Sequence, residues 1–367
     1  MLLFLAGLVL LGLALPPFFD FPRLEFWLLP MAAAYLLLLL VLPRLWLYVL
    51  PIATVGFDLT PWTGRFAYNE IDLLFLVTLC SGLLYGRYRL RVYTPGPATI
   101  GLFLYLVVLA LGYSGWHFFL LPPEASFDNP YYGTEYGYKV LKGIVWGIGL
   151  VPMWGYLLAT DRQRAVTALL TGMCLAALLL ALVVLWERGT LGVLLTGSAW
   201  YHVVNSLLDL SSSYRVTALF SDMHTGGEVV DGMFLLLLPV AVHAAIYGRH
   251  TWLRLLGAVA VSALGYVTLV GFTRATYAAV AIGLIGYALL ALHTRRQAGA
   301  PVPMPVGRLT ITACLGLLTA VLAYRLAGSY GLASYGALVL LAFADSQLKL
   351  TGLLRHGPVS YTHLRAH

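Results

Sequence analysis

The chain has 367 residues, of which 60% are apolar and only 10% carry a formal charge, whereas about a quarter of the residues in a soluble chain are charged. With a mean hydropathy of +0.86, this composition excludes a soluble globular domain, a disordered tail, a coiled coil and a nucleic-acid-binding module. The strict alternation of a membrane β-barrel is absent from the sequence. We therefore predict an all-α, polytopic integral membrane protein.

The charged residues are clustered and leave long charge-free stretches between them. A helix that crosses a bilayer needs about 20 mostly apolar residues, and most of these stretches qualify once their polar flanks are added. The stretches are 1–19, 26–43, 45–57, 73–86, 92–123, 143–160, 165–186, 232–248, 255–273, 275–294, 309–324 and 326–344. They predict about 11–12 transmembrane helices in a single membrane domain, 1–356, with an outer loop between the seventh and eighth. The last stretch would either cross back or begin another outer loop.

The positions of the basic residues predict the orientation, because Lys and Arg near the ends of spans stay on the cytoplasmic side. With Met1 in the cytoplasm, eleven of the nineteen arginines fall in inner loops, whereas of the carboxylates only Asp161 and Asp345 do. We expect a multi-pass protein of the bacterial inner membrane with a cytoplasmic N-terminus. The net charge of +7 then reflects topology and does not indicate acidic partners.

The longest outer segment, 186–228, is predicted to be a periplasmic loop that contains a helix. Residues 199–214 place apolar side chains on one side of a helix, namely Val203, Val204, Leu207, Leu208 and Leu210. This pattern is typical of an amphipathic helix on the outer leaflet, and equally of a helix that packs within the loop.

The end of this loop carries a cluster of polar residues that suits an anion. Arg215, His224 and two glycines precede a helix that begins near Glu228, and both guanidinium groups and helix N-termini offer donors to anions. Two plainer interpretations stay open. Thr225 and Glu228 fit a capping box, and His224 fits a solvated loop histidine.

A second arginine, Arg274, lies between two apolar runs that together exceed the thickness of one bilayer. The chain must turn near it, which places Arg274 at the outer rim. There it would bind an anion or extend to a lipid phosphate, and both alternatives stay open. Arg215 and Arg274 flank the same pair of predicted spans and would converge on one pyrophosphate.

Several motifs follow one another between residues 210 and 292. They are Arg215-x-x-x-Leu219-Phe220, Gly226-Gly227, an apolar span ending near Pro239, a basic inner loop and Thr273-Arg274-Ala275. This order resembles the O-antigen ligase and O-antigen polymerase superfamily of bacterial inner-membrane glycosyltransferases. Pro61-x-x-Gly64 and Glu70-x-Asp72, before the fourth span, are in keeping with the resemblance.

The resemblance implies an enzyme that transfers a glycan at the periplasmic face without a metal, a cofactor or a nucleotide sugar. The donor would be a glycan linked to undecaprenyl pyrophosphate, and the acceptor a lipid, a growing polymer or a protein. By the same analogy, Arg215 and Arg274 would bind the pyrophosphate, on which negative charge grows as the glycosidic bond breaks. His224 and Glu228 would contact the acceptor, because the family's usual base, a histidine in a later outer loop, has no matching motif here.

Two other functions remain open. A polysaccharide polymerase of the O-antigen polymerase type would use the same donor and differ from a ligase in its acceptor. A secondary transporter or lipid-linked-glycan flippase would place ionisable groups near the middle of the bilayer. Here Asp72 and Asp231 lie at span ends, and we expect His243 to be hydrogen-bonded within the helix bundle.

The last residues differ in character from the rest of the chain. Residues 359–367 read VSYTHLRAH, are polar and basic, and resemble the translated adaptor tails of truncated gene models. We expect 357–367 to be a non-native tail on a chain truncated at its C-terminus. His363 and His367 are therefore not considered as site residues.

Overall fold

The computed structural model describes most of the predicted helical regions. The described residues are 2–14, 25–56, 70–87, 134–196, 200–209, 228–271, 280–289 and 306–348, with a few single residues between them. All regular structure in these ranges is α-helical, and none of it is a strand. The prediction of an all-α protein is thus confirmed for the described part of the chain.

Three helical stretches are long and apolar enough to span a membrane: Lys142–Thr190, Thr251–Gly271 and Leu322–Ala344. Shorter apolar helices cover Pro30–Val41, Trp46–Gly56, Ile71–Leu84, Gly232–Tyr247 and Val280–Leu289. A described helix lies in each predicted stretch except 92–123, which the structure describes only at single residues. These apolar helices are those of a helical membrane protein. The predicted tail, 357–367, lies outside the described residues.

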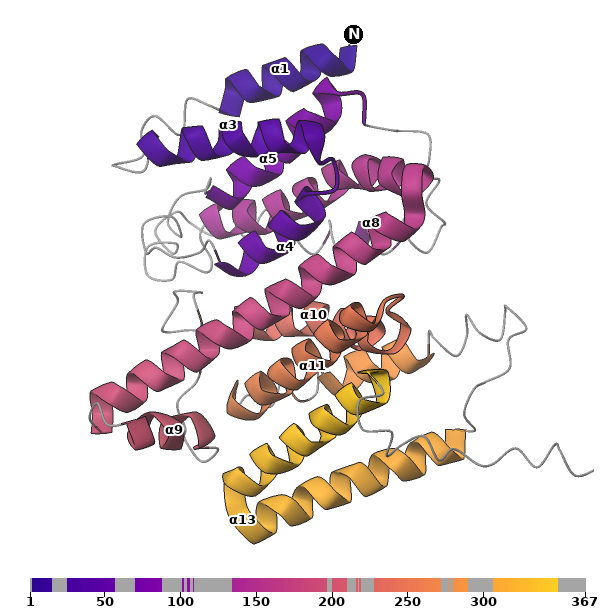
Figure 1. Ribbon diagram of the computed structural model, residues 1–367. Helices are drawn as coiled ribbons and strands as arrows, with labels where there is room; N and C mark the ends of the chain where they lie inside the picture. The colour runs from indigo at the N-terminus through magenta and orange to yellow at the C-terminus, as the bar shows by residue number, and fades with distance from the viewer. Residues whose placement is uncertain are drawn as a thin grey trace, which may run out of the picture. The chain divides into compact units, whose positions relative to one another are not determined.

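The chain forms two compact units, divided between Gly172 and Met173, and each is described by itself. The first contains α1 (Leu2–Ala14), α3 (Glu25–Val41), α4 (Trp46–Gly56), α5 (Glu70–Leu84) and the first part of α8 (Thr134–Thr196). Helices α1, α3 and α4 all pack against α5 (Figure 1). Its core is formed by side chains such as Leu39, Leu47, Val77 and Leu157.

Helix α8 is broken at Asp161, whose backbone angles (φ −156°, ψ 86°) are not helical. The charge cluster between stretches 143–160 and 165–186 therefore coincides with a real break. Beyond it, α8 continues to Thr196, past Trp186, where the outer loop was expected to begin. Glu187 and Arg188 do not end the helix because both residue types have good helix propensity.

Close approach of α8 to α4 depends on Gly172. A Cβ atom at this position would overlap the main-chain carbonyl of Leu47 and press on Cα of Tyr48. Only a residue without a side chain lets the two backbones meet at this distance.

The second unit contains the rest of α8, α9 (Trp200–Leu208), α10 (Glu228–Tyr247), α11 (Thr251–Gly271) and α13 (Val306–Leu348). Helices α10 and α11 form a tightly packed hairpin, in which Leu237, Leu253 and Leu264 are buried (Figure 1). Residues 200–208 confirm a helix inside the predicted range 199–214, although it is shorter than predicted.

Helix α13 is two helices joined by a break at Ala327 and Gly328, where Gly328 has a positive φ of 60°. The second leg runs back beside the first (Figure 1), and the hydroxyl of Thr319 donates a 2.8 Å hydrogen bond to the hydroxyl of Tyr335 across the pair. Of the two alternatives for 326–344, the structure therefore has a helix that returns.

Candidate functional site

The sequence-predicted site residues fall mainly outside the described residues. This applies to Arg215, His224 and Arg274, and Glu228 is described only as the first residue of α10. Whether these four side chains meet stays a prediction. Their described neighbours are informative, because Val216 is buried, the main-chain N–H of Ala218 donates to Glu187 Oε2 at 2.8 Å, and α11 ends three residues before Arg274.

The strongest polar feature of the second unit is Arg188, near the end of α8. Its exposed fraction is only 2%. The Nη2 group donates to the carbonyl oxygens of Ser206 at 2.9 Å and Asp209 at 2.5 Å, and Ser206 Oγ donates to the Arg188 carbonyl at 2.9 Å. The last carbonyls of a helix have no partner within it and carry the negative end of its dipole. A cation is therefore well suited to hold the C-terminal end of α9.

The guanidinium of Arg188 keeps unused donors. Its Nε and Nη1 atoms are buried and have no hydrogen-bond partner among the residues that the structure describes. A guanidinium has five N–H groups, one on Nε and two on each Nη, so the Nη2 bonds leave those of Nε and Nη1 unmatched. Two neutral carbonyls do not balance a buried positive charge, which costs several kcal/mol unless a counter-charge is present. The position is that of an anion-binding arginine.

Two tyrosines complete the surroundings of Arg188. The hydroxyl of Tyr266, on α11, donates to the Leu207 carbonyl at 2.8 Å and interacts electrostatically with Arg188. The hydroxyl of Tyr330, just beyond the break in α13, donates to Asn205 Oδ1 at 2.5 Å. Helices α8, α9, α11 and α13 thus share one polar group, the Arg188 cluster, which consists of Glu187, Arg188, Asn205, Ser206, Leu207, Asp209, Tyr266 and Tyr330.

The Arg188 cluster lies toward one end of the second unit. Tyr266 is near the last residue of α11, whereas the turn between α10 and α11, with Arg249 and Arg254, is at the opposite end of that helix. Large aromatic side chains are exposed beside the cluster, namely Trp186, Trp200 and Tyr201. Exposed Trp and Tyr are typical of the boundary between hydrocarbon and water. The cluster therefore has the surroundings of a membrane interface.

The first unit has a buried ion pair of its own. Asp72, with an exposed fraction of 2%, accepts hydrogen bonds from Lys142 Nζ at 2.5 Å and Trp146 Nε1 at 2.7 Å. The Trp146 ring in turn stacks on Phe75. These contacts join the start of α5 to α8, so a structural role explains the Glu70-x-Asp72 motif in this chain.

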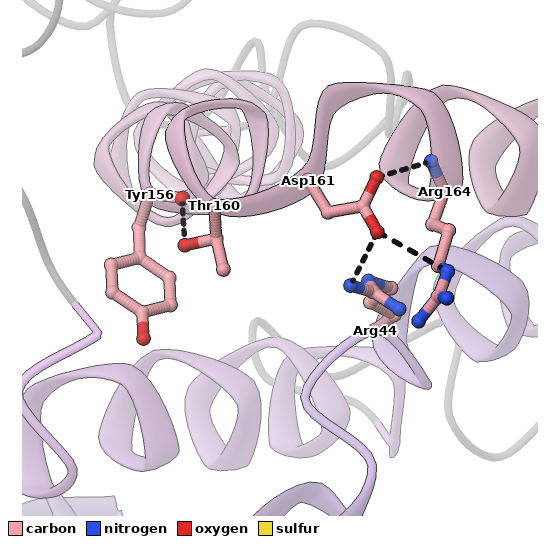
Figure 2. Close-up of polar contacts among 5 residues, drawn as sticks. All are labelled: Arg44, Tyr156, Thr160, Asp161 and Arg164. Carbon is pink, nitrogen blue, oxygen red and sulfur yellow. Dashed lines mark hydrogen bonds and ion pairs between the residues drawn. The ribbon is translucent and has the colours of Figure 1, made fainter.

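A third polar group surrounds the break in α8 (Figure 2). One Asp161 oxygen contacts Arg44 Nη2 at 3.4 Å and Arg164 Nε at 3.2 Å, and the other accepts the main-chain N–H of Arg164 at 3.1 Å. This last bond makes Asp161 the N-cap of the helix that follows. Nearby, Arg87 donates to the carbonyls of Leu39 and Leu40 at the end of α3. The residues predicted for the inner side thus gather at one end of the first unit.

His243 has the partner that the sequence analysis expected. Its Nδ1 atom lies 2.9 Å from the hydroxyl of Tyr287, and the two rings meet edge to face. The prediction that His243 is hydrogen-bonded within the bundle is confirmed.

Sequence reasoning counted Arg188 only as one of the outer arginines and did not select it. Its signal was weak, because an arginine after a long apolar run normally reaches the surface. Only the docking of α9 over it produces the burial. Comparisons of the chain with protein-family models, with curated proteins and with solved structures found no match. The candidate site therefore rests on the sequence motifs and on the geometry of the described residues.

Proposed function

We propose that the protein transfers a glycan from an undecaprenyl-pyrophosphate carrier to a lipid, polymer or protein acceptor at the outer face of the bacterial inner membrane, in the manner of the O-antigen ligases. One observation carries the proposal. The described neighbours of Arg215 and the end of α11, which precedes Arg274, both adjoin the Arg188 cluster at one end of the second unit. The motif order of the sequence supplies the class of reaction.

The chemistry requires cations where the carrier leaves. As the acceptor hydroxyl attacks the anomeric carbon, a new carbon–oxygen bond forms, the bond to the carrier breaks, and its electron pair stays on the pyrophosphate. Guanidinium groups already in place stabilise this growing charge more than they stabilise the ground state. In the proposal Arg215 and Arg274 have this role, a base takes the hydroxyl proton, and His224 and Glu228 contact the acceptor.

The proposal includes about 11–12 transmembrane helices and a cytoplasmic N-terminus. The described helices support it, because they coincide with the predicted stretches and alternate in direction at the charged ends. In the first unit, Arg44, Arg87 and Asp161 lie at one end, as inner-loop residues should. In the second unit, Arg249 and Arg254 lie away from the Arg188 cluster.

The location of charge favours transfer over transport. Transporters need ionisable groups near the middle of the bilayer. Among the residues whose burial is described, the buried charged side chains are Asp72 and Arg188, and both lie near helix ends. His243 is held by Tyr287. A polymerase differs from a ligase only in its acceptor, so the assay must separate the two.

The test is a transfer assay in membranes that contain the protein. The donor is a radiolabelled glycan on undecaprenyl pyrophosphate, and the acceptors are a lipid A core, a second lipid-linked glycan and a protein. We expect glycan transfer together with release of undecaprenyl pyrophosphate. Arg215→Ala and Arg274→Ala should abolish both while inserting normally, whereas the matched control Arg249→Ala, exposed at the other end of the unit, should not.

Each contrary result has a definite meaning. Full activity in either site variant would remove that arginine from the site. Movement of intact lipid-linked glycan across sealed vesicles, with the carrier bond unbroken, would replace the proposal with a flippase.

A further inference from the structure

We propose that Arg188 is a third cationic ligand of the diphosphate group, which it binds through Nε and Nη1. This inference rests on the proposed function, and it adds a residue that the motif analysis did not assign. It starts from an observation independent of those motifs, namely a buried guanidinium with unmatched donors.

The contacts of Arg188 orient the group without neutralising it. Nη2 is fixed by the Ser206 and Asp209 carbonyls at the end of α9, so the planar guanidinium has a set direction. The Nε and Nη1 donors remain, buried and without partners among the described residues. An anionic oxygen at these donors would both complete the hydrogen bonds and balance the charge. A phosphate oxygen fits this requirement, because arginine is the side chain that proteins use most for phosphate recognition.

The surroundings connect this donor group with the proposed site. Glu187, the preceding residue, accepts the N–H of Ala218, which is three residues from Arg215. Tyr266 lies on α11, whose end precedes Arg274. Arg188 therefore lies between the described neighbours of the two predicted diphosphate ligands. Exposed Trp186 and Trp200 place the group at the depth of lipid headgroups.

The experiment measures diphosphate binding directly. The purified chain is placed in phosphatidylcholine nanodiscs, which supply no anionic lipid, and binding of farnesyl diphosphate is measured by calorimetry. Inorganic diphosphate and phosphatidylglycerol are added separately as competitors, to distinguish a prenyl diphosphate from free diphosphate and from an ordinary lipid phosphate. We expect wild-type binding that inorganic diphosphate weakens and phosphatidylglycerol does not.

The variants separate binding from support of α9. Arg188→Gln should bind farnesyl diphosphate at least about tenfold more weakly, which is the usual cost of losing hydrogen bonds to a charged group. Ser206→Ala is the matched control, because it removes only the 2.9 Å bond from Oγ to the Arg188 carbonyl and should bind as the wild type does. Thermal unfolding without ligand is measured for each variant.

Arg188→Lys covers the case in which Arg188→Gln does not fold. It keeps the charge and loses the planar fork, so its affinity should fall several-fold. Unchanged affinity in the folded variant, with a lower unfolding temperature, would show that Arg188 only attaches α9 and would overturn the inference while leaving the proposed function in place. Absence of binding by the wild-type protein would instead contradict the proposed function, and the inference with it. Displacement by phosphatidylglycerol would overturn the assignment to a diphosphate.

Discussion

Lys142 Nζ lies 2.5 Å from a carboxylate oxygen of Asp72, although 70 residues separate the two in the chain. The pair joins the start of α5 to α8 where neither backbone offers a polar contact to the other. A buried ion pair adds little stability over apolar residues of the same size, but removal of one partner leaves the other charge uncompensated. The pair is therefore best understood as a device that fixes how the two helices meet.

The first prediction concerns this pair. Asp72→Asn should lower the free energy of unfolding by about 3 kcal/mol, because Lys142 then loses its counter-charge. The double variant Asp72→Asn with Lys142→Met should recover most of the loss. The measurement is unfolding by sodium dodecyl sulfate in mixed micelles, and equal stability of the single variant and the wild type would contradict the prediction.

The second prediction concerns the N-cap at the break in α8. Asp161→Ala should destabilise the protein by about 1 kcal/mol, because the N–H of Arg164 loses its acceptor. Asp161→Asn should remain close to the wild type, since Asn caps helices equally well and the contacts with Arg44 and Arg164 are partly exposed to solvent. Thermal unfolding of both variants is the measurement. A large loss in Asp161→Asn would show that charge and not capping dominates.

The third prediction compares two glycines on α8. Gly172→Ala should destabilise the protein by about 2 kcal/mol, because the added Cβ forces α8 away from the Leu47 carbonyl. Gly147→Ala is the matched control, since nothing lies within 4 Å of its added Cβ, and it should be neutral or stabilising by about 0.5 kcal/mol. The same micelle unfolding assay measures both, and similar values for the two variants would contradict the packing seen here.

The fourth prediction concerns orientation. In a background with the three native cysteines replaced, Tyr201→Cys should react with a membrane-impermeant maleimide added to intact cells. Arg249→Cys should react only after the membrane is opened. Both positions are exposed and belong to the same unit, so accessibility of the side chain does not explain a difference. The opposite pattern would reverse the proposed topology.

The helices were predictable because each apolar stretch is bounded by charge, and a bilayer rewards that pattern without regard to tertiary contacts. The break at Asp161 followed from the same rule, since Asp161, Arg162 and Arg164 interrupt two long apolar runs. The end of α8 was not predictable in this way. Charged residues such as Glu187 and Arg188 mark the limit of an apolar run, but they do not end a helix.

The polar contacts needed the structure. Nothing near Asp72 in sequence identifies Lys142 as its partner, because the contact depends on how α5 and α8 pack. Arg188 becomes buried only when α9 lies over it, and no local pattern records that docking. Conversely, Arg215 and Arg274 stand out as motif residues, and their convergence stays a prediction.

The break at Gly328 gives α13 two legs of roughly 20 residues, which is about the length that crosses one bilayer. Tyr330 follows that break directly and is fixed to Asn205 of α9. An inserted residue in either leg would rotate the remaining helix by about 100° and shift it by about 1.5 Å. The two legs therefore act as a ruler for the outer helix: their length sets the rotation and height at which Tyr330 arrives, and substitutions there should be far better tolerated than insertions or deletions.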